Sequence, residues 1–459
     1  MPEQTVDQQF AIQSSTPISS VAAITPNTIA ARIPGVFKFM RSSPRFVMRS
    51  SSTVLLVCAA ALSACTEPTA PPRRYPVLDD VGQNDWAAVS AGGDHTCALT
   101  TDGAAFCWGS NQFGQLGFSR VDTLCGPASA HYACSLTPRA VQSGVKFTAI
   151  SAGAHHTCAL TASREAFCWG ANSDNQTGDF TIGGPTPVKV PGSLPWAQVS
   201  AGYSHSCAVR TDGALFCWGS NDRGQLGTGN LISGLGLFRV SLPAPVASVS
   251  AGQSRTCART TVGTVYCWGA VWTQRESGLE ITRSQTTPEL VPQSPAMAWL
   301  SVGSFTTCGT DVSGFAYCWE GNPRGGIGDG TLEGSTEPQR VATDLEFLQV
   351  ESGIAQACGV VTNGAGYCWG DDSFGQLGVS PSLLIERCAD GTLPCSTRPV
   401  AVLGRQQFTT ISTGLGSHTC GVTTRGNLYC WGLGFSGQRG DGSMATGVSI
   451  PTLVADRKQ

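Results

Sequence analysis

Two short runs of alternating side chains, joined by a tight turn, recur seven times between residues 97 and 430. In the third copy the segment reads CAVRTDGALFCWG. In every copy the residue after the first cysteine is alanine or glycine, and the residue before the second is phenylalanine or tyrosine. Six residues after the first cysteine stands a glycine, except in the second copy, which has Arg164. A glycine there suits a hairpin whose last turn residue is left-handed. The pattern predicts two antiparallel strands.

Both faces of this predicted hairpin carry side chains that need burial. In its register the two cysteines lie opposite each other, and the aromatic residue lies opposite the small one. A tryptophan follows the second cysteine in every copy, on the same face as the aromatic residue because strand side chains alternate. An isolated hairpin cannot bury such a set. Repeats 49 to 62 residues apart, with room for four short antiparallel strands each, predict an all-β, seven-bladed β-propeller over residues 81–459.

Eighteen cysteines fall into nine closely spaced pairs. Seven pairs are the opposed hairpin positions, which are close enough for disulfides. The other two pairs fall in the two longest repeats, where each insertion is predicted to carry its own disulfide. Nine disulfides indicate an oxidising compartment. The predicted pairs are Cys97–Cys107, Cys125–Cys134, Cys158–Cys168, Cys207–Cys217, Cys257–Cys267, Cys308–Cys318, Cys358–Cys368, Cys388–Cys395 and Cys420–Cys430.

Zinc is the alternative explanation for these cysteines, because a histidine precedes some of them by two residues. Three repeats have Arg255, Thr306 or Gln356 at that position instead, and a Cys-x9-Cys spacing is not typical of zinc. We therefore expect no metal site and no cofactor. The histidines concerned are His95, His156, His205 and His418.

A Pro-x-x-Val segment precedes most repeats, and its last copy, Pro451 to Val454, follows the seventh hairpin. With no eighth repeat to lead into, this C-terminal strand is predicted to pair with the first blade and close the ring, which leaves no open sheet edge. Pro76 to Asp79, ahead of the first repeat, matches the Pro-x-x-Val pattern less well, and the C-terminal strand could displace it.

The N-terminal region predicts export. In residues 40–65, arginines precede a short apolar run that ends in Leu-Ser-Ala-Cys. This tetrad resembles the bacterial lipobox, which implies lipidation of Cys65; cleavage after Ala64 or a retained anchor are the alternatives. By the same resemblance, Thr66 implies an outer-membrane lipoprotein of the bacterial cell envelope. Residues 66–80 are predicted to be a Pro-rich tether. Residues 1–39 are expected to be disordered or to precede a true start at Met40 or Met48.

Composition and charge narrow the functional classes. Only 13% of the residues are charged and the formal net charge is −3, without a basic stripe. Without a basic stripe, binding to nucleic acid or to an anionic membrane surface is not expected, so the predicted membrane contact is the lipid anchor alone. No catalytic residue is predicted, since no nucleophile motif or phosphate loop occurs. Two pairs of loop acids are expected to be solvated turn residues: Asp371/Asp372 and Asp329/Glu333.

The full repeat, SAGxxHTCAL…TxDGxxFCWGxNxxGQLG, resembles the regulator of chromosome condensation repeat, and its cysteine pairs resemble the exported bacterial branch of that family. The resemblance covers residues 81–459 and implies a seven-bladed propeller that binds proteins through its blade loops. The eukaryotic founder is a nuclear guanine nucleotide exchange factor that binds nucleosomes, and a bacterial relative caps β-lactamases. Exchange activity is not carried over, because no loop here matches the exchange site residue by residue.

Loops that break the repeat are the expected binding elements, because the strands are committed to the core. They are 118–137, 379–398 and 270–287. In the last, Trp272, Arg275 and Glu276 are the candidate partner-binding residues, with packing of Trp272 over its own blade as the alternative. We expect a monomeric, tethered propeller that binds a protein through one rim. The alternatives are an envelope enzyme that binds or cleaves polysaccharide and, less favoured, an exchange-factor-like regulator.

Overall fold

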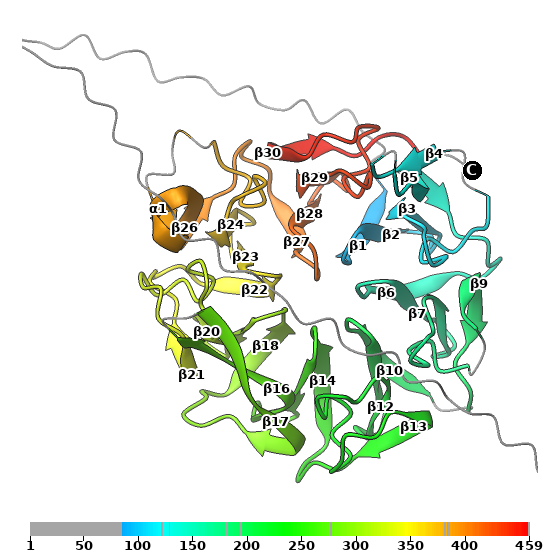
Figure 1. Ribbon diagram of the computed structural model, residues 1–459, viewed down its shortest axis with the longest axis horizontal. Helices are drawn as coiled ribbons and strands as arrows, with labels where there is room; N and C mark the ends of the chain where they lie inside the picture. Colours follow the sequence, from blue (N-terminus) through cyan, green and yellow to red (C-terminus); the bar gives the residue numbers. More distant parts are fainter. Residues whose placement is uncertain are drawn as a thin grey trace, which may run out of the picture. The chain divides into compact units, whose positions relative to one another are not determined.

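The computed structural model describes residues 85–457, apart from 121–122, 128, 180–181, 193–194, 276–277, 381 and 383–385. These residues form seven antiparallel sheets arranged as blades around a central axis, with almost no helix (Figure 1). The predicted seven-bladed propeller is confirmed. In this described part of the chain, no helix has the length and apolarity that crossing a bilayer requires. The predicted signal peptide with Cys65, the tether and residues 1–39 lie outside it.

Each blade begins with an inner strand that contacts the inner strands of its neighbours. Blade one contains β1 (Trp86–Ala91), β2 (His95–Thr100), β3 (Ala105–Ser110), β5 (Tyr132–Ala140) and the added strand β4 (Thr123–Cys125). Blade two contains β6 (Phe147–Ala152), β7 (His156–Thr161), β8 (Ala166–Gly170) and β9 (Gly184–Lys189). Blade three contains β10 (Trp196–Ala201), β11 (His205–Arg210), β12 (Leu215–Gly219) and β13 (Gly234–Val240). Blade four contains β14 (Val246–Ala251), β15 (Arg255–Thr260), β16 (Val265–Arg275) and β17 (Gly278–Leu290).

The remaining three blades follow the same order. Blade five contains β18 (Met297–Val302), β19 (Thr306–Asp311), β20 (Ala316–Glu320) and β21 (Ser335–Arg340). Blade six contains β22 (Phe347–Ser352), β23 (Gln356–Val361), β24 (Gly366–Asp371), β26 (Leu393–Ala401), the two-residue strand β25 (Arg387–Cys388) and the short helix α1 (Ala389–Thr392). Blade seven contains β27 (Phe408–Ser412), β28 (His418–Thr423), β29 (Leu428–Leu433) and β30 (Gly447–Leu453).

The central hairpin of each blade has the predicted register. In blade three, Cys207 pairs with Cys217 and Ala208 with Phe216, and the other six hairpins repeat this pairing. All nine predicted cysteine pairs form disulfides in the structure. The tryptophan after each second cysteine is completely or almost completely buried, so both faces of the hairpin are covered.

The buried tryptophans also join each blade to the preceding one. At six of the seven blade boundaries the indole Nε1–H donates to a backbone carbonyl of the preceding blade's GQLG loop, or its equivalent, at 2.9 Å. The donor–acceptor pairs are Trp108–Gln438, Trp169–Gln115, Trp218–Gln176, Trp268–Gln225, Trp369–Gly326 and Trp431–Gln376. Because Trp108 belongs to blade one and Gln438 to blade seven, this set includes a bond that closes the ring.

The four histidines for which zinc was considered form a second set of links between blades. Each holds Nε2 at 2.8–2.9 Å from a hydroxyl of the next blade: His95–Thr157, His156–Ser206, His205–Thr256 and His418–Thr96. Burial lowers the pKa of His156 and His418 to about 3 and that of His205 to about 4, so these rings are neutral near pH 7. Among the described residues, no group of three or more His, Cys, Asp or Glu could hold a metal ion.

The C-terminal strand completes the ring as predicted, but not through pairing with the first blade. β30 pairs with β29 and is the outer strand of blade seven. The prediction failed because the Pro-x-x-Val segment ends its own blade rather than leading into the next, as β5 shows in blade one. Ring closure instead uses the Trp86 N–H, which donates to Gly426 O at 3.1 Å, and Arg457, which pairs with Asp85 at 2.9 Å. Pro76 to Asp79 lies outside the described residues.

Arg164 stands at the left-handed turn position with a φ of 63°, where the other six hairpins have glycine. Its side chain is exposed and contributes little packing. Because this conformation costs an L residue about 1–2 kcal/mol, Arg164→Gly should raise the free energy of unfolding by about 0.5–1 kcal/mol in denaturant titrations. Ser163→Gly in the same turn is the matched control and should lower it. Equal effects of the two substitutions would contradict the strain at Arg164.

Candidate functional site

The strand order gives the propeller two different rims. The first, called the GQLG rim, contains the loops between the first and second strands of each blade and those between the third and fourth. The second, called the turn rim, contains the tight hairpin turns and the connections between blades. All three loops that break the repeat belong to the GQLG rim, so this rim carries the sequence variation expected of a binding surface.

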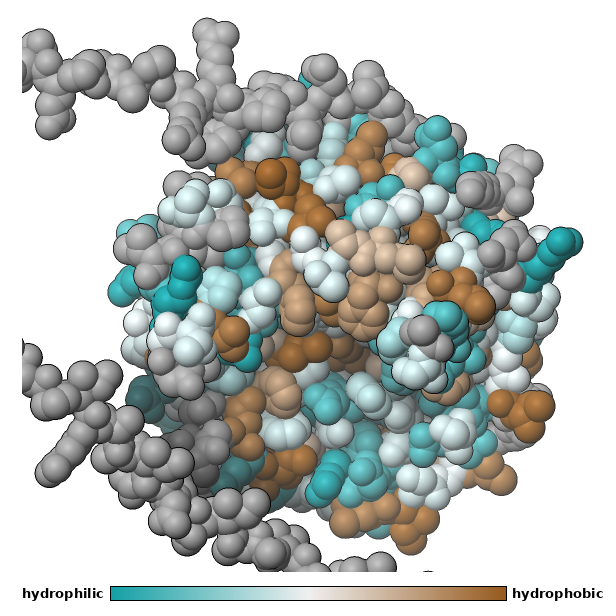
Figure 2. Space-filling model, turned by 45° about the horizontal axis from the view of Figure 1, so that its top comes forward, coloured by the Kyte–Doolittle hydropathy of each residue, from teal (hydrophilic) through white to brown (hydrophobic). Residues whose placement is uncertain are grey.

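Exposed apolar side chains are concentrated on the GQLG rim. Nine of the eighteen large exposed hydrophobic residues in the described chain lie in its loops, and two more lie beside them, Leu124 on β4 and Leu235 at the start of β13. The loops of the turn rim have Val262 and Val312, and two more lie beside them, Leu290 at the end of β17 and Leu348 at the start of β22. The nine are Phe113, Ile182, Tyr203, Leu231, Ile232, Leu332, Phe374, Phe435 and Met444. Figure 2 shows apolar groups alternating with polar ones around a hollow on the face in view.

Three of the rim aromatics form a row across blades one to three. The ring centroids of Phe113 and His155 are 5.2 Å apart, and those of His155 and Tyr203 are 5.5 Å apart. Phe113 is 43% exposed and Tyr203 41%. Burial lowers the pKa of His155, opposed by the nearby Asp94, so its ring is neutral near pH 7. The row is therefore an uncharged aromatic strip held between GQLG-rim loops.

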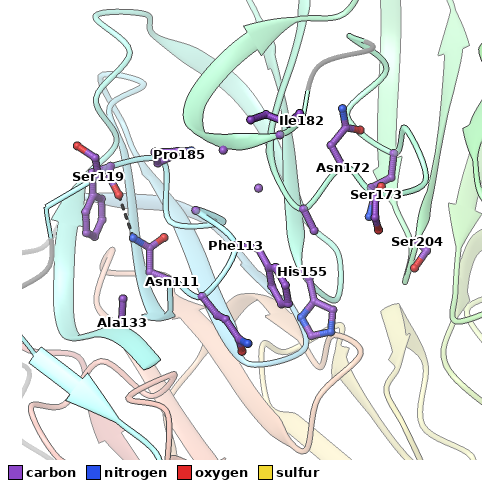
Figure 3. A pocket seen from close by; sticks show the side chains of 18 residues that line it. Asn111, Phe113, Ser119, Ala133, His155, Asn172, Ser173, Ile182, Pro185 and Ser204 are labelled. Atoms are coloured by element: carbon purple, nitrogen blue, oxygen red, sulfur yellow. Dashed lines mark hydrogen bonds between the residues drawn. The ribbon is translucent and has the colours of Figure 1, made fainter. Parts of the chain in front are cut away.

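A cavity of about 540 Å³ lies beside this row, between blades one and two (Figure 3). Phe113 and His155 form one side, and Ile182, which is fully exposed, and Pro185 contribute apolar groups at another. The amide groups in its wall are used structurally: Asn111 Nδ2 donates to Phe118 O at 2.9 Å, and its Oδ1 accepts from Leu116 N at 3.0 Å. The cavity thus offers a mainly apolar recess next to exposed aromatic rings, which suits a side chain of a partner.

The two disulfide-containing insertions lie on the same rim. The Cys125–Cys134 disulfide joins β4 to β5, and the Cys388–Cys395 disulfide joins β25 to β26. The first insertion also contacts blade seven, where Tyr132 Oη lies 2.6 Å from Ser436 Oγ. Its Leu124 is 60% exposed. Both predicted insertion disulfides are present, and they fix the strands that carry exposed side chains such as Leu124.

The third predicted loop, 270–287, is a long hairpin of β16 and β17 that lies across blade five (Figure 1). Trp272 is half-buried and packs edge to face on Phe305 of blade five, with ring centroids 5.0 Å apart. It covers the neighbouring blade rather than its own. The side chain of Arg275 and all of Glu276 lie outside the described residues. A partner-binding role for these three residues stays a prediction.

Two of the four loop acids that were expected to be solvated are buried in the structure. Asp371 and Asp372 are buried: Asp371 pairs with Arg324 at 2.5 Å, and Asp372 accepts from Leu377 N at 2.9 Å. Burial raises the pKa of Asp372 to about 7. That prediction was wrong because Asp372 fills the loop position where blade one has Asn111. Asp329, by contrast, accepts from Thr331 in an exposed turn.

Models of the regulator of chromosome condensation (RCC1) repeat match residues 86–115, 147–176, 196–225 and 408–438, and also 102–160, 165–209 and 212–259. The chain belongs to the RCC1 repeat family. The tryptophan links and the GQLG rim described above are therefore features of a propeller of this family. Sequence reasoning found the repeat but not the row, because its residues come from variable loop positions in three repeats.

Curated relatives of this family match short stretches. The ultraviolet-B receptor UVR8 of Arabidopsis thaliana is 31% identical over 101 residues, 22% of this chain and 21% of its own length. The human probable E3 ubiquitin-protein ligase HERC3 is 32% identical over 104 residues, 22% of this chain and 9% of its own. The chain therefore spans about a fifth or less of these relatives.

Solved structures match most of the propeller. Human WBSCR16 superposes with a TM-score of 0.65 at 20% identity, covering 77% of this chain and 94% of that one. Prp20p of Saccharomyces cerevisiae superposes with a TM-score of 0.66 at 18% identity, covering 81% and 88%. At these identities the likeness shows the shared fold.

Proposed function

We propose that this protein is an exported, membrane-tethered propeller that binds another protein through its GQLG rim. The observation that carries the proposal is the unequal distribution of exposed apolar side chains, nine in the loops of the GQLG rim against two in the loops of the turn rim. Apolar patches bordered by polar groups are typical of protein contacts. The row of Phe113, His155 and Tyr203 supplies aromatic anchors of the kind that dominate such interfaces.

The family likeness supports a protein partner. The solved structure of Prp20p was reported with its binding to Gsp1p and histones, and in a second structure the same protein is bound to Kap60. Two human relatives, HERC3 and HERC5, are named as ligases, and this chain covers only 9% and 8% of their length. The nine disulfides and the lipobox-like tetrad that ends in Cys65 support export and tethering. Trp272, Arg275 and Glu276 are secondary candidates for the same contact, since their hairpin extends from the same rim.

A polysaccharide-cleaving activity is the second candidate, and it requires paired carboxyl groups. At seven equivalent positions on the inner strands stand six serines and one carboxylate, Glu351. Glu351 accepts hydrogen bonds from Ser301 Oγ at 2.8 Å and Trp299 Nε1 at 3.1 Å. This arrangement supports the binding module over the hydrolase.

Site-specific photocrosslinking in intact cells tests the proposed rim. A photoreactive amino acid at Phe113 should capture a partner protein that mass spectrometry identifies, whereas the same amino acid at Val312, exposed on the turn rim, should not. Capture of the same protein only from Val312 would assign binding to the turn rim and overturn the proposal.

Substitution of Cys65 tests the tether. If the thiol of Cys65 carries the lipid, Cys65→Ser should abolish labelling by a fatty-acid analogue and move the protein from the membrane fraction to the soluble fraction. Cys58→Ser, within the predicted signal, is the matched control and should leave both unchanged. Retention of the Cys65→Ser protein in membranes would indicate a retained anchor instead.

A further inference from the structure

The boundary between blades four and five differs from the six that carry the tryptophan link. Blade four replaces its GQLG loop with the β16–β17 hairpin, so the loop carbonyl that accepts the indole proton elsewhere is missing. Within the described residues, Trp319 Nε1 has no hydrogen-bond partner. Trp319 is completely buried. An unsatisfied buried N–H costs about 1–3 kcal/mol, which indicates that some other acceptor occupies the place of the carbonyl.

The residue after Trp319 departs from the repeat in the same place. Glu320 has a φ of 83° at a position that is glycine in the other six blades, such as Gly269. Its carboxylate forms an ion pair with Arg255, which stands where four blades have histidine, and accepts from Thr307 Oγ1 at 3.1 Å. Both charged side chains are more than nine-tenths buried. A side chain held in this strained conformation is typical of a functional site.

A cavity of about 230 Å³ lies against these groups. Trp319, Glu320, Arg255 and Thr273 line its inner part, and Thr273 Oγ1 also has no hydrogen-bond partner in the described structure. Liquid water occupies about 30 Å³ per molecule, so the space exceeds what one structural water fills.

The charges in and around the cavity are already balanced. Arg255 pairs with Glu320, and at the outer end Arg283 pairs with Glu289 at 3.0 Å. A charged ligand would add an uncompensated charge to the inner part, which is costly to desolvate. The unpartnered groups require an acceptor for the Trp319 N–H and either a donor or an acceptor for Thr273. A hydroxyl group supplies both.

We propose that this cavity binds a neutral, polyhydroxylated ligand such as a monosaccharide unit, with one oxygen accepting from Trp319 Nε1 in place of the missing loop carbonyl. The site is independent of the main proposed partner contact, because the row of Phe113, His155 and Tyr203 lies across blades one to three and the cavity lies between blades four and five. Failure of either proposal leaves the other unaffected.

The indole proton of Trp319 reports directly on this site. In ¹⁵N-labelled protein, assigned with Trp319→Phe, neutral D-glucose, D-galactose, N-acetylglucosamine and myo-inositol are each titrated, with sodium acetate as the anionic probe. At least one neutral probe should shift the Trp319 resonance saturably. The resonance of Trp268 should not move, because its Nε1 is bonded to Gln225 O. Thr273→Val should keep the fold and weaken the binding of that probe at least fivefold.

Three results would overturn the proposal. Absence of a saturable shift with all four neutral probes would mean that water alone fills the cavity. Saturation by acetate but by none of the neutral probes would mean an anion site. Binding unaffected by Thr273→Val, with the Trp319 shift retained, would place the probe outside the cavity.

Discussion

Replacing Phe113 and Tyr203 together by alanine should weaken binding of the captured partner at least thirtyfold, and up to about a thousandfold if their contributions add. The estimate follows from about 2 kcal/mol or more per aromatic hot spot. The two rings do not touch each other, but both contact His155, so partial coupling is expected. Because both side chains are about two-fifths exposed, the melting temperature should change little.

The matched control lies on the opposite rim. Val262 and Val312 are 71% and 73% exposed, and alanine at both removes apolar surface without touching the aromatic row. Surface plasmon resonance with the identified partner should show unchanged affinity for this pair. Loss of affinity in the valine variant together with normal affinity in the aromatic variant would assign the contact to the turn rim.

His156→Gln should change the pH dependence of stability by about 3 kcal/mol between pH 7 and pH 4. His156 is buried and its folded pKa is about 3, below the ordinary value of 6.5. The unfolded chain therefore binds a proton that the folded chain does not, so stability present above pH 6.5 is lost as the pH falls toward 3. At about 1.4 kcal/mol per pH unit, the loss at pH 4 is about 3 kcal/mol. Glutamine does not titrate, so the His156→Gln protein does not lose this free energy of unfolding.

Glutamine is a substitution that the fold already contains at this position. In blade six Gln356 takes the place of the histidine and donates to Gly416 O at 3.0 Å. The test compares free energies of unfolding of the two proteins at pH 7 and pH 4 from urea titrations. Buried carboxyl groups with raised pKa, such as Glu351 and Asp372, change stability in the opposite direction but equally in both proteins. Parallel pH profiles would show that His156 keeps an ordinary pKa.

Local spacing made the hairpins predictable, since ten residues and one left-handed turn position leave a single register for Cys207 and Cys217. The same information could not locate where a blade begins. A periodic sequence reads identically from any starting point, so Pro451 to Val454 was assigned to the wrong neighbour. Burial of Asp372 was missed because its role depends on the loop it caps.

Contacts across blade boundaries were the other part that the sequence did not reveal. The repeat contains the histidines, but not the information that each meets a hydroxyl about fifty or more residues away. Trp272 stood out as unmatched, yet its packing on Phe305 depends on how far a long hairpin leans over the next sheet. The row from Phe113 to Tyr203 arises from three loops with different sequences, so no single motif marks it.

The agreement between repeat and blade has a consequence for how such a ring can change in size. Every blade is built from one uninterrupted stretch of chain and carries its own disulfide, so no sheet depends on a strand contributed from the far end. Duplication or loss of a fifty-residue gene segment therefore adds or removes a whole, internally crosslinked sheet. An inserted blade can then join the ring if the preceding blade offers a carbonyl to its tryptophan and the following blade offers a hydroxyl to its histidine.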